Sequence, residues 1–346
     1  MQNVALKRND VLLNITGDSV ARCCTVPESI LPARVNQHVA IIRTREKDLD
    51  PIFLRYYLTT PMMQEFMLGM AQSGGGTRNA LTKGMIEKIV VPKPRIEEQI
   101  AIVRILSVVD ELIGELDELT EKKRNIKEGA MQELLTGKRR LSGYTGNWEV
   151  KNFEDVIDGF AAGQTPYRAK PEYYKGSIPW ITSGELDYNV ITETREKITP
   201  EAVHDTNLKI IPKGTFLFAI TGLEAEGTRG SCAITGIEAT TNQSCMALYP
   251  KRGLLTTNYL FHYYVEFGKR LSLTYCQGTK QQSYTAATAK LLPIILPPTP
   301  EEQSAIAQIL SDMDAEIRAL KKRRDKYLMI EKGMMQQLLT GRIRLR

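Results

Sequence analysis

A long internal repeat is the feature that most constrains what this chain can fold into. Residues 94–142 align with residues 298–346 without a gap, at a shift of 204, and 23 of the 49 positions are identical. Both copies follow a proline-rich segment, continue with Glu-Glu-Gln and end in Leu-Leu-Thr-Gly. The chain is therefore two copies of one unit, in which a mixed globular segment is followed by a long helical segment.

Weaker matches extend the repeat upstream. They are Thr16-Gly17 with Thr221-Gly222, and Asn36-Gln37 with Asn242-Gln243. The second unit begins near Gly143, whereas the first begins where the second has already reached about Thr206. We therefore expect roughly sixty residues of the first unit to be absent before Met1.

Residues 97–135 and 301–339 are predicted to be helices. The proline-rich segments and the Glu pairs suit helix starts, and Thr-Gly suits helix ends. Apolar residues recur at alternating intervals of four and three, at Ile102, Leu106, Val109, Ile113 and Leu116, and at Ile306, Leu310, Met313, Ile317 and Leu320. This heptad seam predicts that the two helices lie against each other. The alternative is that each helix packs only into its own domain.

The globular segments are predicted to be α+β domains of short strands with one helix each. The expected helices lie near Pro51–Met70 and Thr257–Leu271. Expected strands include Thr215–Thr221, Ser231–Thr235, Met246–Tyr249 and Leu291–Leu296. The expected domain bounds are 1–95 for a partial first domain, 96–142 for the first long helix and linker, 143–299 for the second domain and 300–346 for the second long helix.

Composition narrows the function classes. The net charge of +6 over 346 residues permits a nucleic-acid partner without requiring one. No apolar run is long enough to span a membrane, and no secretory signal is visible. The five cysteines lack a pairing pattern and the three histidines lack ligand spacing, so we expect reduced thiols and no metal site. The motifs of amino-methylation, of the P-loop and of serine hydrolases are missing, which disfavours an enzyme acting alone on DNA.

The duplicated set of motifs resembles the specificity (S) subunit of type I restriction-modification systems. The second unit adds Trp148, then Gly163-Gln164-Thr165-Pro166, then Ile178-Pro179-Trp180-Ile181. The first unit lacks this opening, so the chain looks like an N-terminally truncated member. The resemblance implies two target recognition domains joined by two long antiparallel coiled-coil helices.

By the same resemblance, the chain would recognise a bipartite target in double-stranded DNA as a non-catalytic, cytoplasmic subunit without a cofactor of its own. The long helices would recruit two adenine methyltransferase (M) subunits, and endonuclease/translocase (R) subunits can join that complex. The alternative is an inactive or partial recognition unit that acts as a scaffold without a full DNA target of its own.

Candidate DNA-contacting residues are polar or basic and lie in glycine-containing loops, because Arg and Lys suit guanine edges while Asn and Gln suit adenine. They are Thr77, Arg78, Asn79, Gln164, Thr165, Thr182, Ser183, Arg229, Lys280, Gln281, Gln282 and Ser283. The basic runs at 138–140 and 321–324 are either phosphate contacts or exposed helix faces. Candidate M-subunit contacts are Leu134, Leu135, Leu338 and Leu339 at the helix ends.

Overall fold

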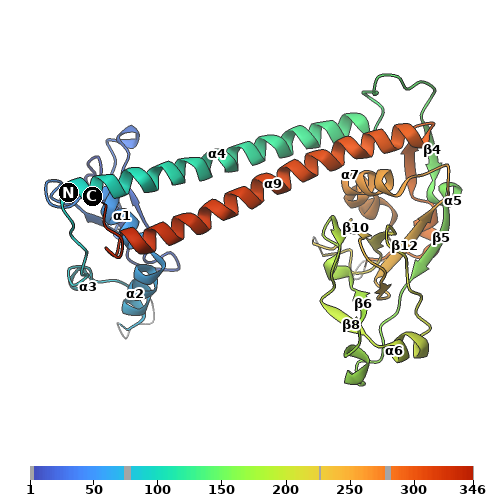
Figure 1. Cartoon of the computed structure of the whole chain (residues 1–346), viewed down its shortest axis with the longest axis horizontal. Helices are drawn as coiled ribbons and strands as arrows, with labels where there is room; N and C mark the ends of the chain where they lie inside the picture. Colours follow the sequence, from blue (N-terminus) through green and yellow to red (C-terminus); the bar gives the residue numbers. More distant parts are fainter. Residues whose placement is uncertain (1–3, 74–78, 226, 277–281, 346) are drawn as a thin grey trace. The chain divides into compact units, whose positions relative to one another are not determined.

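The computed structural model describes residues 4–73, 79–225, 227–276 and 282–345. The chain divides into two compact units. Unit 1 comprises Met1–Glu121 and Arg318–Arg346, and unit 2 comprises Lys122–Ile317. Two long helices, α4 (Ile96–Leu134) and α9 (Pro300–Leu338), each contribute one part to each unit (Figure 1). Their bounds agree with the predicted helices to within one residue.

Helices α4 and α9 pack antiparallel within each unit. In unit 1, Ile102 and Leu106 from the start of α4 share a core with Leu338 near the end of α9. In unit 2, Leu134 from the end of α4 shares a core with Ile306 from the start of α9. Most residues of the expected heptad seam are buried, which confirms that the apolar stripes face each other.

Unit 1 holds a three-stranded antiparallel sheet in the order β2-β1-β3. Its strands are β1 (Val11–Asn14), β2 (Cys23–Thr25) and β3 (Val39–Ile42). Its other elements are η2 (Glu28–Ile30), α1 (Pro51–Thr59), α2 (Pro61–Gln72) and α3 (Lys83–Ile86). Val11 and Leu13 of β1 are fully buried in a core with Leu54 and Leu58 of α1.

The single helix expected near Pro51–Met70 is two helices, which corrects the prediction. Thr60 has extended backbone angles (φ −60°, ψ 144°) and separates α1 from α2. The physical reason is Pro61, because a residue before proline avoids helical angles and proline itself lacks the N–H that would continue the ladder. The Thr60 side chain then caps α2 by accepting a hydrogen bond from Met63 N.

Unit 2 contains a five-stranded sheet in the order β5-β12-β9-β10-β7, a three-stranded sheet β11-β6-β8 and a two-stranded sheet β13-β4. The strands are β4 (Glu149–Asn152), β5 (Ile157–Ala162), β6 (Ile178–Ile181), β7 (Asn189–Ile191), β8 (Glu196–Ile198), β9 (Phe216–Ala219), β10 (Cys232–Thr235), β11 (Thr240–Thr241), β12 (Cys245–Pro250) and β13 (Pro293–Leu296). The helices are α5 (Phe153–Val156), η3 (Pro171–Tyr174), η4 (Ser183–Glu185), α6 (Pro200–Asp205), α7 (Thr257–Tyr275) and α8 (Ala286–Lys290).

The internal repeat is visible in the sheets. Strands β2-β1-β3 of unit 1 occupy the same order as β10-β9-β12 of unit 2, and both triplets are antiparallel. In unit 2, β5 extends the triplet beside β12, and β7 extends it beside β10. The weak upstream sequence matches therefore mark one structural core that occurs twice.

Candidate nucleic-acid interface

In unit 2, three segments meet where β9 ends and β12 begins. Ile220 N donates to Ser244 O at 2.9 Å, and Tyr284 N donates to Ile220 O at 2.8 Å. The Oγ1 of Thr221 lies 2.7 Å from Ser244 Oγ. Asn242 accepts a hydrogen bond from Ser244 N at 3.1 Å, which turns the chain into β12.

Unit 1 repeats these contacts one for one. Ile15 N donates to His38 O at 2.9 Å, and Leu81 N donates to Ile15 O at 2.8 Å. Thr16 Oγ1 lies 2.6 Å from His38 Nδ1, and Asn36 accepts from His38 N at 3.0 Å. The same backbone geometry therefore presents side chains at the same end of each sheet.

Each Thr is followed by a glycine that the turn requires. Gly17 has φ +80° and Gly222 has φ +72°, a left-handed conformation that other residues adopt only with strain. Beside each turn stands an exposed glutamine, Gln37 in unit 1 and Gln243 in unit 2. We call these groups the strand-end clusters: Thr16, Gln37 and His38 in unit 1, and Thr221, Gln243 and Ser244 in unit 2.

The strand-end cluster of unit 1 borders a hollow of about 840 Å³. Thr16, His38 and the predicted residue Asn79 all line it. Asn14, which also lines the hollow, donates to Ser19 Oγ at 2.6 Å and so holds one wall in place. Its lining combines hydrogen-bonding side chains with apolar atoms and the carboxylate of Asp18, which suits the edge of a base better than a phosphate.

The Gly163-Gln164-Thr165 segment lies beside the strand-end cluster of unit 2. Gln164 N donates to Thr241 O at 3.0 Å, and Thr165 Oγ1 donates to Gln243 Oε1. A Cβ on Gly163 would lie 1.9 Å from Thr241 O, so only glycine fits there. The structure thus brings the predicted residues Gln164 and Thr165 to Gln243, with the Gln164 side chain exposed.

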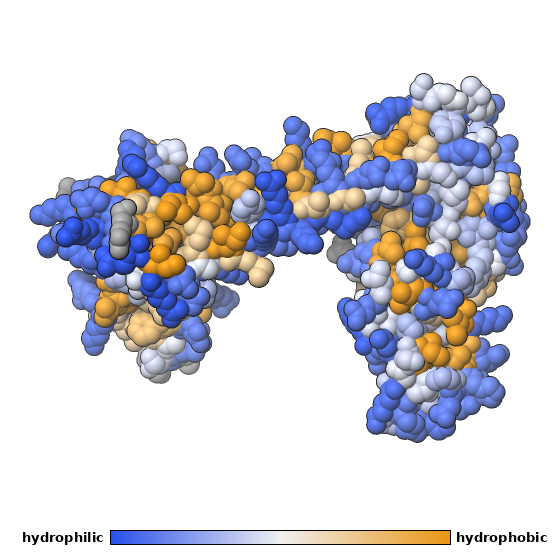
Figure 2. Space-filling view, viewed as in Figure 1, coloured by the Kyte–Doolittle hydropathy of each residue, from blue (hydrophilic) through white to orange (hydrophobic). Residues whose placement is uncertain are grey.

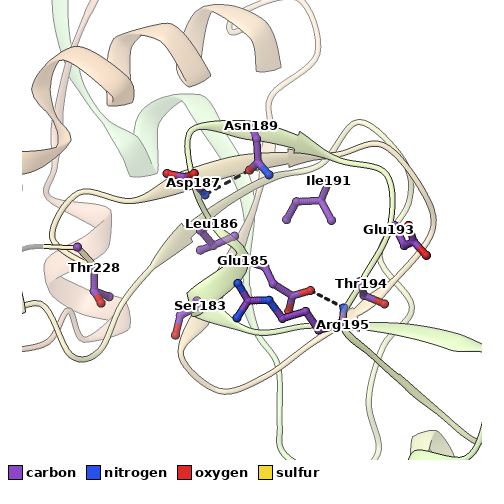
Figure 3. A pocket seen from close by; sticks show the side chains of 12 residues that line it. Ser183, Glu185, Leu186, Asp187, Asn189, Ile191, Glu193, Thr194, Arg195 and Thr228 are labelled. Atoms are coloured by element: carbon purple, nitrogen blue, oxygen red, sulfur yellow. Dashed lines mark hydrogen bonds between the residues drawn. The ribbon is translucent and has the colours of Figure 1, made fainter. Parts of the chain in front are cut away.

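Thr182 and Ser183 lie at the start of η4. The Glu185 carboxylate accepts hydrogen bonds from the backbone N and the Oγ1 of Thr182, both at 2.8 Å. Ser183 lines a hollow of about 650 Å³ together with Glu185, Asp187 and Glu193, and Figure 3 shows these side chains around it. Because three carboxylates meet one cation there, Arg195, this hollow is unfavourable for a phosphate.

Arg229 holds the turn after β9 in place. Its Nε donates to Leu223 O at 2.9 Å, and its Nη2 donates to Glu224 O at 3.1 Å. Glu224 in turn accepts from Gln282 N at 2.9 Å, and Ser283 forms a β-bridge with Thr221. Gln282 and Ser283 therefore adjoin the strand-end cluster, whereas Arg229 supports the turn that leads into it. The predicted residues Thr77, Arg78, Lys280 and Gln281 lie outside the described residues.

Sequence reasoning did not include the strand-end clusters among its site residues. The Thr-Gly and Asn-Gln matches were the available signal, since they align the two turns. That signal did not reveal that the two motifs meet in space, because 20 or more residues separate them along the chain. Hydrogen bonding across the sheet end brings them together.

The four leucines at the helix ends are buried inside their own units, which corrects their assignment as partner contacts. Leu134 and Leu135 are 1% and 0% exposed in the core of unit 2. Leu338 and Leu339 are 8% and 0% exposed in the core of unit 1. They anchor each helix end to the core of its unit and offer no surface to another subunit.

The Glu-Glu-Gln motif acquires a clear structural role. In unit 2, Arg140 donates to both carboxylate oxygens of Glu302, at 2.9 and 2.6 Å. In unit 1, Arg344 does the same to Glu98, at 2.7 and 2.6 Å, and this contact lowers the pKa of Glu98. Each long helix therefore binds the segment that follows the other one. Arg140 is thus engaged within the chain and does not act as the phosphate contact considered above.

The glutamine of the motif fastens each helix start to the adjacent domain. Gln99 Oε1 accepts from Asp50 N at 2.8 Å, and Asp50 caps α1. Gln303 Oε1 accepts from Thr256 N at 2.9 Å, and Thr256 caps α7. The motif thus sets the orientation of the long helices on both domains in the same way.

Within the described part of the chain, no group of three or more His, Cys, Asp or Glu side chains is placed to hold a metal ion. Over the same residues, no helix has the combination of length and apolar character that crossing a bilayer requires.

Comparison with known proteins identifies a matching family. A family model described as "Type I restriction modification DNA specificity domain" matches residues 2–127 and 145–328. The type I restriction enzyme MjaIX specificity subunit of Methanocaldococcus jannaschii is 34% identical over 187 residues, which cover 52% of this chain and 40% of that protein. The MjaVIII specificity subunit of the same organism is 24% identical over 360 aligned positions, which cover 100% of this chain and 81% of that protein.

A solved structure shares the fold. The crystal structure of the type I restriction-modification S subunit from M. genitalium matches with a TM-score of 0.64 at 14% identity. The match covers 98% of this chain and 85% of that one. The similarity therefore extends over both units and both long helices.

Proposed function

Because the chain belongs to the type I restriction modification DNA specificity family, we propose that it recognises a bipartite target in double-stranded DNA, with one half read by each unit. The observation that carries this proposal is the duplicated strand-end cluster. Each cluster offers an exposed glutamine beside a hydroxyl or imidazole group on a rigid sheet end. Glutamine can make two hydrogen bonds to an adenine edge in the major groove.

The long helices are the proposed binding surface for two methyltransferase subunits. Figure 2 shows apolar side chains among the hydrophilic ones along these helices. Ile126 of α4 and Ile330 of α9 are 48% and 40% exposed, and they occupy equivalent positions in the repeat. Apolar side chains exposed at equivalent positions suit two copies of one partner, whereas the buried leucines do not. Endonuclease/translocase subunits would join the assembled complex.

In this proposal the chain recognises the DNA target, and the methyltransferase subunits carry out the methyl transfer. A recognition subunit needs base-reading groups on a rigid support, which the strand-end clusters supply. The alternative of a scaffold with an inactive first domain is not favoured, since unit 1 has its own buried core and a complete strand-end cluster.

The experiment is to map methylated adenines in cells that carry this chain together with its methyltransferase subunit. We expect one motif with two defined halves separated by a spacer of constant length. Gln37→Ala should relax the choice of base in one half only, and Gln243→Ala in the other half only. Methylation without a defined motif, or one motif half that neither variant changes, would contradict the proposal.

A further inference from the structure

The two strand-end clusters differ at one position. Thr16 and Gln37 of unit 1 correspond to Thr221 and Gln243 of unit 2, and the backbone hydrogen bonds around them are the same. The third position is His38 in unit 1 and Ser244 in unit 2. Among the three residues of each cluster, this is the position at which the two units differ, and unit 2 in addition has Thr165 hydrogen-bonded to Gln243.

His38 stands further out than Ser244. The Ser244 side chain is half-buried, and its hydroxyl is engaged by Thr221 at 2.7 Å. His38 is exposed and borders the hollow of unit 1. Its Nδ1 hydrogen-bonds Thr16 Oγ1 at 2.6 Å, and its Nε2 makes a long hydrogen bond of 3.4 Å with the amide Nε2 of Gln37.

This arrangement leaves a ring nitrogen of His38 beside the glutamine at the outer surface. A neutral imidazole carries one donor and one acceptor, and the partner on Nδ1 selects which role Nε2 takes. Thr16 holds the ring at Nδ1, whereas Nε2 makes only the long hydrogen bond with Gln37, which a base edge can replace. At the equivalent position of unit 2, Ser244 has a shorter side chain that ends at the hydroxyl bonded to Thr221.

We propose that His38 is a specificity-determining residue, which reads one base pair of the half-site bound by unit 1 through its Nε2 atom. This inference rests on the proposed function and adds to it the reason why the two halves of the target differ. In unit 2, the matching base pair is left to Gln243. Hydrogen bonds to base edges are the interactions that distinguish one base pair from another.

The test replaces His38 by the residue that unit 2 already uses. In His38→Ser, the new hydroxyl can bond Thr16 as Ser244 bonds Thr221, so the cluster should keep its geometry. The matched control is His204→Ser, because His204 is exposed on α6 and belongs to neither strand-end cluster. Each variant is expressed with the methyltransferase subunit of the system, and methylated motifs are sequenced and their rates of methylation compared.

We expect His38→Ser to reduce discrimination at one base pair of one half-site by roughly 5- to 100-fold, with the other half-site and the spacer unchanged. His204→Ser should leave the motif as it is. If the wild-type motif is well defined and His38→Ser retains it in full, the role of His38 is overturned while the proposed function stands. Equal loss of methylation at every site, with an unchanged melting temperature, would also overturn it. If the wild-type complex has no defined motif, both proposals fail.

Discussion

Lys127 Nζ of α4 lies 2.6 Å from Asp314 Oδ1 of α9. At the equivalent positions in the other half of the repeat, two carboxyl groups replace this ion pair. The equivalent positions in unit 1 are Glu331 and Asp110, two carboxyl groups that share a hydrogen bond. Asp110 also accepts from Tyr56 OH at 2.5 Å and pairs with Arg55 at 3.5 Å. Partial burial and the Asp110 carboxylate together raise the pKa of Glu331 to about 7.

This contact predicts a stability that depends on pH. The folded-state pKa of Glu331 lies above its ordinary value of 4.5, so the folded protein binds the extra proton and loses stability as pH rises from about 4.5 to about 7. Glu331→Gln cannot titrate, and we expect it to be more stable than wild type at pH 8 by roughly 0.5–1 kcal/mol, after allowance for solvent screening. The advantage should vanish at pH 4.

Thermal unfolding at the two pH values checks this. Glu118→Gln is the matched control, since Glu118 is exposed on the same helix pair. A gain from Glu331→Gln that is the same at pH 4 and pH 8 would show that the carboxyl pair is not its cause.

The Arg140–Glu302 contact predicts a large effect from one surface cation. The Glu302 side chain is fully buried, so removing Arg140 leaves its carboxylate without its charged partner. We expect Arg140→Ala to destabilise unit 2 by about 3 kcal/mol. Arg139→Ala is the control, because Arg139 pairs with Glu133 at an exposed site and should cost no more than about 1 kcal/mol. Chemical denaturation measures both, and equal losses would refute a special role for Arg140.

Substitutions of exposed and of buried side chains on the long helices should have different effects. Ile126→Asp and Ile330→Asp change exposed side chains, so we expect folded protein that binds the methyltransferase subunit at least tenfold more weakly. Leu134→Asp places a carboxylate in a buried core and should unfold unit 2 instead. Pull-down together with circular dichroism distinguishes these results. Full binding by both isoleucine variants would place the partner surface elsewhere.

The length of the helix pair predicts the spacer of the DNA target. The ion pairs Asp117–Arg324 in unit 1 and Lys127–Asp314 in unit 2 set the register of the two helices, in which residues 117–123 and residues 318–324 form one heptad each. Deleting residues 117–123 together with residues 318–324 removes one heptad from each helix. The apolar positions then keep their spacing, and each helix becomes about 10 Å shorter. We expect the methylated motif to change its spacer by roughly three base pairs, or recognition to be lost. An unchanged spacer in an active variant would exclude the helices as its determinant.

The candidate site divides into parts that local patterns could predict and parts that they could not. Gln164 and Thr165 were predicted from a short motif, and the structure places them beside Gln243. Arg229 was predicted on the same grounds, yet its guanidinium binds two backbone carbonyls of its own turn. A basic residue in a glycine-containing loop looks the same in sequence whether its donors are free or engaged.

By itself, the amino-acid sequence determined the duplicated architecture, the two long helices with their apolar seam, and four of the strands of unit 2, β9, β10, β12 and β13. These features follow from periodicity and local backbone preference, which neighbouring residues specify. Only the tertiary structure decided which residues meet: Glu98 with Arg344, Glu331 with Asp110, and Thr16 with His38. The reason is that periodicity assigns a side chain to a face of its helix or strand, whereas its partner depends on the register between segments that lie far apart in the chain.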